Sequence, residues 1–84
     1  MPYFVYILEC VDGTLYTGST NDLQRRLKAH NNSKSGAHYT KIRRPVVLKY
    51  SEKLKNRSVA LKKEIALKKL SRAQKMDLIL TARH

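Results

Sequence analysis

The stretch Tyr3-Phe4-Val5-Tyr6-Ile7-Leu8-Glu9 and the segment Val11-Asp12-Gly13-Thr14-Leu15-Tyr16-Thr17 that follows it decide the fold. The first stretch is aromatic, β-branched and nearly all apolar, which predicts a buried strand over residues 3–9. The sequence Val11-Asp12-Gly13 predicts a tight turn, and residues 14–17 predict a second strand, which Gly18 ends. The chain therefore opens with a β-hairpin.

The length of the hairpin loop decides whether Tyr6 and Tyr16 share a face of the sheet. A two-residue loop, Asp12-Gly13, would place them on opposite faces. A three-residue loop with its glycine in the left-handed conformation would pair Leu8 with Tyr16 and Tyr6 with Gly18, on one face. A single strand tyrosine is more often a packing residue, but a site that uses both tyrosines predicts the longer loop.

The sequence from residue 21 to residue 44 predicts one helix and one loop. Residues 22–30 predict a helix, with Asn21 and Gln24 as a capping box at its start. The polar, basic residues 31–44 predict a loop.

The second half predicts one strand and two helices. Pro45 stands at the first position of a third strand that runs to residue 50. Residues 57–70 predict a helix, and Ser71 with Gln74 forms a capping box for a last helix toward Arg83. The order ββαβαα predicts an α+β fold, in which residues 1–84 form one domain with a small antiparallel three-stranded sheet flanked by helices.

The charge of the chain points to a polyanionic partner. Lysine and arginine number 18 against 6 acidic residues, which gives a net charge of +12. Such a field attracts nucleic acid first and an anionic membrane second, or it keeps a small protein soluble. No apolar stretch reaches the roughly 20 residues that span a bilayer, and the N-terminus does not resemble a secretory signal. The lone Cys10 excludes an internal disulfide and is consistent with a reducing cytoplasm.

One face of the predicted helix 22–30 combines apolar and basic side chains. Spacing at i, i+3, i+4 and i+7 places four residues together: Leu23, Arg26, Leu27 and His30. Because the leucines point to the core, Arg26 and His30 are expected at its edge. They form either a snorkelling arginine and a satisfied histidine or part of a functional site.

Glu64 is an isolated acidic residue in a lysine-rich helix beside an apolar stripe. A carboxylate in that setting needs a cationic partner. Two interpretations stay open: a helix ion pair with Lys68, or a ligand to Mg²⁺, whose coordination water and phosphate oxygens would complete.

Taken together, these residues resemble the GIY-YIG nuclease superfamily, above all its short, one-domain bacterial branch. Phe4-Val5-Tyr6 stands where the family has Gly-Ile-Tyr, and Tyr16-Thr17-Gly18 where it has Tyr-Ile-Gly. The helix Arg25–His30 is similar to the family's arginine helix, and Glu64 falls at the position of its metal-binding glutamate. Many members carry an asparagine in the final helix, and residues 71–84 contain none.

The resemblance implies hydrolysis of phosphodiester bonds with a single divalent ion, Mg²⁺ or Mn²⁺. It assigns Tyr6 as general base and Tyr16 as the residue that orients the nucleophile or binds phosphate. Arg26 would stabilise transition-state charge, His30 would move a proton or bind phosphate, and Glu64 would hold the metal. The nucleic-acid-binding residues implied with them are Gly18, His38, Tyr39, Lys41, Arg43 and Arg44.

Three functions therefore compete. The first is a metal-dependent endonuclease that acts on DNA, with branched or damaged DNA among the candidate substrates. The second is a non-catalytic nucleic-acid-binding module that retains the nuclease fold, and the third is a ribosome-associated basic protein. The choice of DNA over RNA rests on the resemblance, because a charge of +12 suits either.

Overall fold

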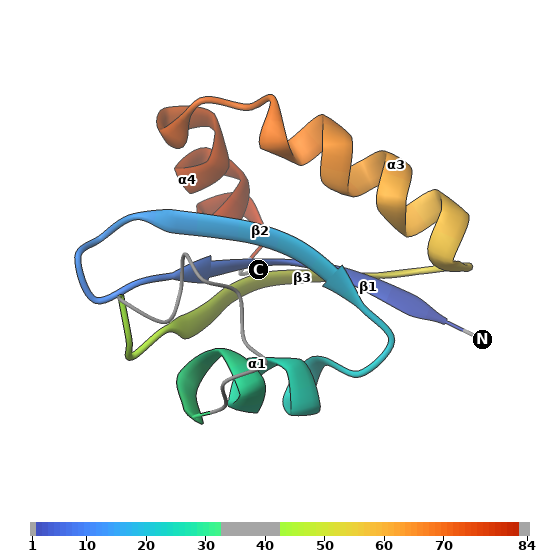
Figure 1. Ribbon diagram of the computed structural model, residues 1–84. Helices are drawn as coiled ribbons and strands as arrows, with labels where there is room; N and C mark the ends of the chain where they lie inside the picture. The colour runs from blue at the N-terminus through green and yellow to red at the C-terminus, as the bar shows by residue number, and fades with distance from the viewer. Residues whose placement is uncertain (1, 33–42, 83–84) are drawn as a thin grey trace.

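A computed structural model describes residues 2–32 and 43–82. Within these residues, three strands and three helices follow one another in the order ββαβαα (Figure 1). They are β1 (Tyr3–Glu9), β2 (Leu15–Thr20), α1 (Leu23–Asn32), β3 (Val47–Leu54), α3 (Arg57–Lys68) and α4 (Arg72–Thr81). The α+β class and the element order predicted from the sequence are confirmed.

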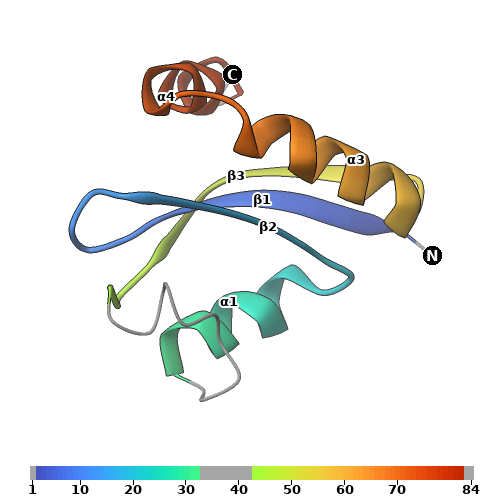
Figure 2. The same ribbon diagram turned by 45° about the horizontal axis from the view of Figure 1, so that its top comes forward.

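The strands form one antiparallel sheet with β1 in the centre, in the order β2-β1-β3. Helix α1 covers one face of this sheet, and α3 and α4 lie over the other (Figures 1 and 2). Strand β2 is consequently an edge strand with a helical layer on each side. No helix in the described part of the chain is long and apolar enough to cross a bilayer.

The β1–β2 hairpin turns through three residues, as a shared tyrosine face requires. Leu8 pairs with Tyr16 and Tyr6 pairs with Gly18. Gly13 has a φ of +85°, a left-handed conformation that glycine adopts without steric cost. The predicted register is therefore confirmed, and Tyr6 and Tyr16 lie on the same face of the sheet.

Alternation along β1 divides the core between the two faces. Tyr6 and Leu8 are buried on the side of α1, where Leu23 and Leu27 pack against them. Val5 and Ile7, the two central odd-numbered residues of β1, are fully buried on the side of α3. The central strand is thus packed on both faces, which fixes the strand and the residues it presents.

The second strand is longer than the sequence indicated. Gly18 does not end β2; the strand continues through it to Thr20. The prediction was wrong because a glycine in a strand also marks a close approach by another group. Here that group is the ring of Tyr6.

The start and end of α1 also differ from the prediction. Asp22 and not Asn21 caps the helix, since its carboxylate accepts a hydrogen bond from the Arg25 backbone N–H at 3.1 Å. The helix then runs to Asn32 and includes two residues assigned to the following loop. Boundaries of this kind shift by a residue or two because several cap residues stand in a row here.

The third strand covers Val47–Leu54 and so begins after Pro45 and ends later than predicted. The alternation of exposed and half-buried residues continues through its last four positions, which the sequence pattern did not capture because they are mostly polar. In α4 the predicted capping box is confirmed: Ser71 and Gln74 exchange both hydrogen bonds.

Candidate functional site

Gly18 lets the Tyr6 side chain lie across strand β2. A methyl group built on Gly18 would stand 2.5 Å from the Tyr6 Oη and 2.7 Å from its Cζ. No side chain fits in that space, so the phenol reaches over the backbone of the edge strand only because residue 18 is glycine. The hydroxyl group of Tyr6 is in this way fixed beside β2.

His30 lies beneath the two tyrosines and is fully buried. Its Nε2 is 3.0 Å from the Tyr6 Oη, and its ring meets those of Tyr6 and Tyr16 edge to face, with centroids 5.9 and 5.2 Å apart. Burial, together with the charges of Arg26 and Arg44, lowers the pKa of His30 to about 4. The imidazole is therefore neutral at physiological pH.

Arg26 completes this group from the same face of α1. Its Nε donates to the Tyr6 Oη at 3.4 Å, and its side chain is half-buried. Burial is the largest influence on Tyr6 and raises its pKa, and the hydrogen bond and charge of Arg26 offset only part of the rise. Tyr6 is thus a protonated phenol that accepts from Arg26. It donates to the neutral His30 when that imidazole carries its proton on Nδ1.

Glu64 approaches from the opposite face of the sheet, on α3. Its Oε1 accepts a hydrogen bond of 2.6 Å from the Ser19 hydroxyl, and its Oε2 lies 2.8 Å from the ammonium of Lys68. Burial alone would raise the pKa of Glu64, but the hydrogen bonds from Lys68 and Ser19 outweigh it and hold the pKa below its usual range. The ion pair expected from the sequence is therefore present, on a carboxylate whose side chain is only 16% exposed, and the role of Glu64 as a metal ligand stays a prediction.

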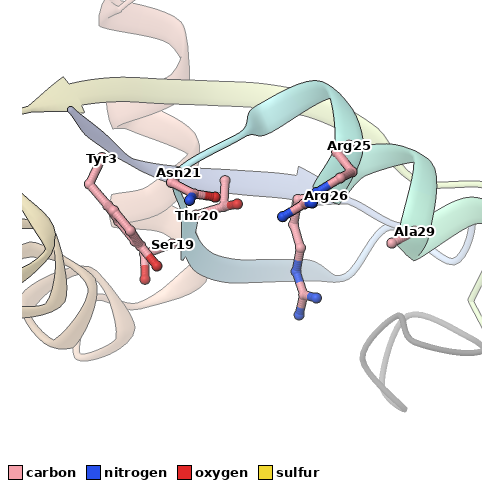
Figure 3. Close-up of a pocket in the computed structure, with 7 residues that line it drawn as sticks. All are labelled: Tyr3, Ser19, Thr20, Asn21, Arg25, Arg26 and Ala29. Atoms are coloured by element: carbon pink, nitrogen blue, oxygen red, sulfur yellow. The ribbon is translucent and has the colours of Figure 1, made fainter. Parts of the chain in front are cut away.

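The two groups meet at the end of β2. Gly18 and Ser19 are adjacent and face opposite sides, so the edge strand holds the Tyr6 phenol on one side and the Glu64 carboxylate on the other. The carboxylate is close enough to add to the rise in the pKa of Tyr6. A cavity of about 480 Å³ opens beside this point, with Ser19 and Arg26 in its lining (Figure 3).

A metal ion at this site would have few protein ligands and would keep most of its water or phosphate ligands. The described residues contain no group of three His, Cys, Asp or Glu side chains placed to share an ion. Mg²⁺ keeps several of its waters and needs only one or two carboxylates with substrate phosphates. Glu64 and the Ser19 hydroxyl offer an oxygen-only donor set that fits such an ion, although Lys68 must move away from the carboxylate to admit it.

The other residues predicted to bind nucleic acid lie either away from this cluster or outside the part of the chain that the structure describes. Arg43 pairs with Asp12 at 3.0 Å, and Arg44 donates to the backbone carbonyls of Ala29 and His30 near the end of α1. Both arginines thus hold the chain after the loop against the rest of the fold. Three further predicted nucleic-acid contacts fall outside the described residues: His38, Tyr39 and Lys41.

Sequence reasoning missed Ser19, the residue that ties Glu64 to the sheet. A signal existed, because two neighbouring strand residues must face opposite sides. With Gly18 on the tyrosine face, Ser19 could only face the other helical layer. The sequence did not show that α3, with Glu64, would cover that face of the sheet.

The fold and the cluster of tyrosine, histidine and arginine are those expected of a domain from the nuclease family that the sequence resembles. The chain matches the family described as the GIY-YIG catalytic domain over residues 2–77, and it belongs to that family, as the resemblance predicted. It is 52% identical over 77 residues to a UPF0213 protein of Desulfotalea psychrophila, which covers 92% of this chain and 70% of that protein. A UPF0213 protein of Syntrophus aciditrophicus is 54% identical over 76 residues, 90% of this chain and 87% of the relative.

Solved structures agree with these relatives. The solution NMR structure of a UPF0213 protein from Bacillus halodurans is 42% identical, with a TM-score of 0.62 over 96% of this chain and 85% of that one. The solution NMR structure of a protein from E. faecalis is 44% identical, with a TM-score of 0.66 over the same shares. Membership of the family implies a nucleic-acid substrate, and its nucleases generally use divalent metal ions.

Proposed function

We propose that this protein is a metal-dependent endonuclease that hydrolyses phosphodiester bonds in DNA, with branched or damaged DNA among its substrates. The observation that carries the proposal is the junction at the end of β2. A phenol bonded to an arginine and a neutral histidine stands there across the edge strand from a partly buried carboxylate. The net charge of +12 supplies the attraction for a polyanion.

The proposed roles follow from the hydrogen bonds. Tyr6 accepts the proton of the attacking water as its own O–H proton passes to Nε2 of His30, so no free phenolate is needed. At neutral pH the relay starts from a phenol that keeps its proton, because its pKa is raised, and from an imidazole that is unprotonated, because its pKa is about 4. Arg26, already oriented by Tyr6, places a fixed positive charge where the phosphate gains negative charge.

Tyr16 positions His30 by edge-to-face packing and presents its hydroxyl to the phosphate. Glu64 with Ser19 would hold one Mg²⁺ or Mn²⁺, which would stabilise the charge of the departing oxygen.

The unpaired Cys10 fits a reducing compartment, and we propose that the reaction takes place in the cytoplasm.

Plasmid nicking tests the proposal. Purified protein with Mg²⁺ or Mn²⁺ should nick supercoiled plasmid, and Glu64→Gln and Tyr6→Phe should each reduce the rate by about 10²-fold or more. The chain offers matched controls, because Tyr50 donates to Glu52, and Glu52 pairs with Lys63, away from the cavity. Tyr50→Phe and Glu52→Gln should therefore nick at the wild-type rate.

Two results would contradict these roles. Unchanged nicking by both site variants would remove Tyr6 and Glu64 from the mechanism. Binding of DNA without cleavage of plasmid, nicked, linear or branched substrates would favour the non-catalytic module.

A further inference from the structure

The cavity beside the site extends well beyond the residues that the proposed hydrolysis uses. It measures about 480 Å³, within the range of about 300–1,000 Å³ typical of small-molecule sites. Figure 3 shows two sides: Tyr3, Ser19 and Asn21 on one, Arg25 and Arg26 on the other. Only Ser19 and Arg26 belong to the junction at β2, which leaves three lining residues without a role: Tyr3, Asn21 and Arg25.

The arginine side of the cavity has a positive charge that no described carboxylate neutralises. Neither Arg25 nor Arg26 takes part in any of the four ion pairs among the described residues. Arg26 bonds the phenol of Tyr6, and Arg25 is exposed at the start of α1. Guanidinium groups that line a cavity favour a phosphate, whose oxygens match their planar donors.

The opposite side offers different chemistry. Tyr3 is half-buried at the start of β1 and supplies an aromatic ring, while the exposed Asn21 supplies a carboxamide. An aromatic ring stacks on any nucleobase, and a carboxamide can both donate to and accept from a base edge. Ring and carboxamide lie across the cavity from the guanidinium groups. A nucleotide is complementary to this arrangement, because its base matches the ring and carboxamide and its phosphate matches the guanidinium groups.

We propose that this cavity is a subsite for the nucleotide that adjoins the scissile phosphate. Its phosphate lies on Arg25, its base stacks against Tyr3, and Asn21 bonds the base edge. The assignment rests on the proposed function for the position of the scissile phosphate, at the Arg26 end. The subsite would fix the register of the strand relative to Tyr6 and Glu64.

Titration with a mononucleotide tests the subsite without any cleavage. The probe is 2′-deoxyadenosine 5′-monophosphate, followed by amide NMR shifts at constant ionic strength, with inorganic phosphate and deoxyadenosine as partial ligands. The mononucleotide should bind at least about tenfold more tightly than either part. Arg25→Gln and Tyr3→Leu should each weaken it about tenfold, and Asn21→Ala should weaken it a few-fold.

Matched variants make the result decisive. Lys28 is exposed on the same helix and does not line the cavity, so Lys28→Gln, with the same change of charge as Arg25→Gln, should leave affinity unchanged. Equal losses in both variants would overturn the subsite, because attraction would then be non-specific. Thermal melting tests whether the Tyr3→Leu variant is folded. If that variant is unfolded, Asn21→Ala, a substitution at an exposed position, decides the base contact.

The subsite and the hydrolysis can fail separately. Binding that survives Glu64→Gln but is lost in Arg25→Gln supports the subsite even if wild-type protein nicks no plasmid. Nicking that depends on Glu64, with no difference between Arg25→Gln and Lys28→Gln, overturns the subsite and leaves the nuclease in place.

Discussion

The two faces of the sheet contribute different halves of the candidate site. On the face under α1, a buried neutral histidine, a phenol and an arginine form a hydrogen-bonded chain. On the face under α3, a carboxylate is held by a hydroxyl and a lysine near the surface. The first half can move a proton and stabilise an anion, whereas the second can hold a cation. Edge strand β2 joins them, because Gly18 and Ser19 face opposite ways.

The two halves should therefore respond to different kinds of substitution. The α1 half depends on packing, since its polar atoms are buried and satisfied by one another. The α3 half depends on charge, because Lys68 is 54% exposed and can leave the carboxylate. Substitutions in the first should change both fold and rate, and substitutions in the second should change metal binding with little effect on the fold.

The largest effect is expected from Arg26→Ala. Removing a fixed charge that acts mainly in the transition state should reduce plasmid nicking by about 10²- to 10³-fold. Arg26→Lys should recover part of the rate, since it keeps the charge but loses the planar donors. Single-turnover nicking measures the effect, with Lys28→Ala as the exposed control on α1. A normal rate in Arg26→Ala would assign the catalysis to the α3 half alone.

A second prediction concerns the buried histidine and acid. The pKa of His30 is about 4 in the folded protein and about 6.5 in the unfolded chain, so between these values only the unfolded chain binds the proton. Stability should be complete above pH 6.5 and fall by roughly 3 kcal/mol as the pH drops to about 4. Urea unfolding at several pH values measures this loss.

His30→Gln is the matched variant, because glutamine can accept from Tyr6 but does not titrate. It should flatten the dependence between pH 4 and 6.5. The lowered pKa of Glu64 adds a loss of the same sign only at lower pH. An equal slope in the variant would show that His30 is not the group responsible.

Gly18→Ala should disturb the α1 half through sterics alone. The added methyl group would meet the Tyr6 ring at 2.5–2.7 Å, so the ring must move and its bond to His30 must lengthen. We expect a loss of about 1–3 kcal/mol in unfolding free energy together with slower nicking. Adding Tyr6→Phe removes the nearest atom but not Cζ, so it should restore only part of the stability.

Ser19→Ala is the neighbouring test on the other face. It removes the hydrogen bond to Glu64 without adding an atom, so stability should fall by about 1 kcal/mol or less. If Gly18→Ala proved as stable as wild type, the phenol would not be confined by β2, and the two halves would not share this strand.

The hairpin could be predicted from the sequence because its determinants are local. Gly13 in the loop and the run of apolar residues in β1 fix the register, and with it the shared face of Tyr6 and Tyr16. The grouping of Arg26 with His30 could also be predicted, since helical spacing puts both on one face of α1.

The rest required contacts between distant segments. Nothing near Glu64 in the sequence indicates that Ser19, 45 residues earlier, would donate to it. Gly18 was taken as the end of a strand because sequence alone does not show the Tyr6 ring that needs its space. For the same reason the cavity lined by Tyr3 and Arg25 was not predicted, as it forms only when β1 and α1 come together.

The smallest effect on the fold, and the sharpest test of the α3 half, comes from Lys68→Gln. The ammonium of Lys68 lies 2.8 Å from Glu64 Oε2, where it competes with any metal ion for that oxygen. Because the Lys68 side chain is 54% exposed and Glu64 keeps its hydrogen bond from Ser19, the free energy of unfolding should change by about 0.5 kcal/mol or less. Affinity for Mn²⁺, measured by calorimetry, should instead increase several-fold, because a competing charge is removed.

Lys69→Gln is the control for this change. It removes the same charge one residue further on, at the C-cap of α3, where Lys69 is exposed and forms no ion pair among the described residues. It therefore reports the effect of net charge alone. A larger gain in Lys68→Gln than in Lys69→Gln would establish direct competition at Glu64. Weaker binding in Lys68→Gln would mean that the lysine orients the carboxylate, and the α3 half would then depend on local order as much as the α1 half does.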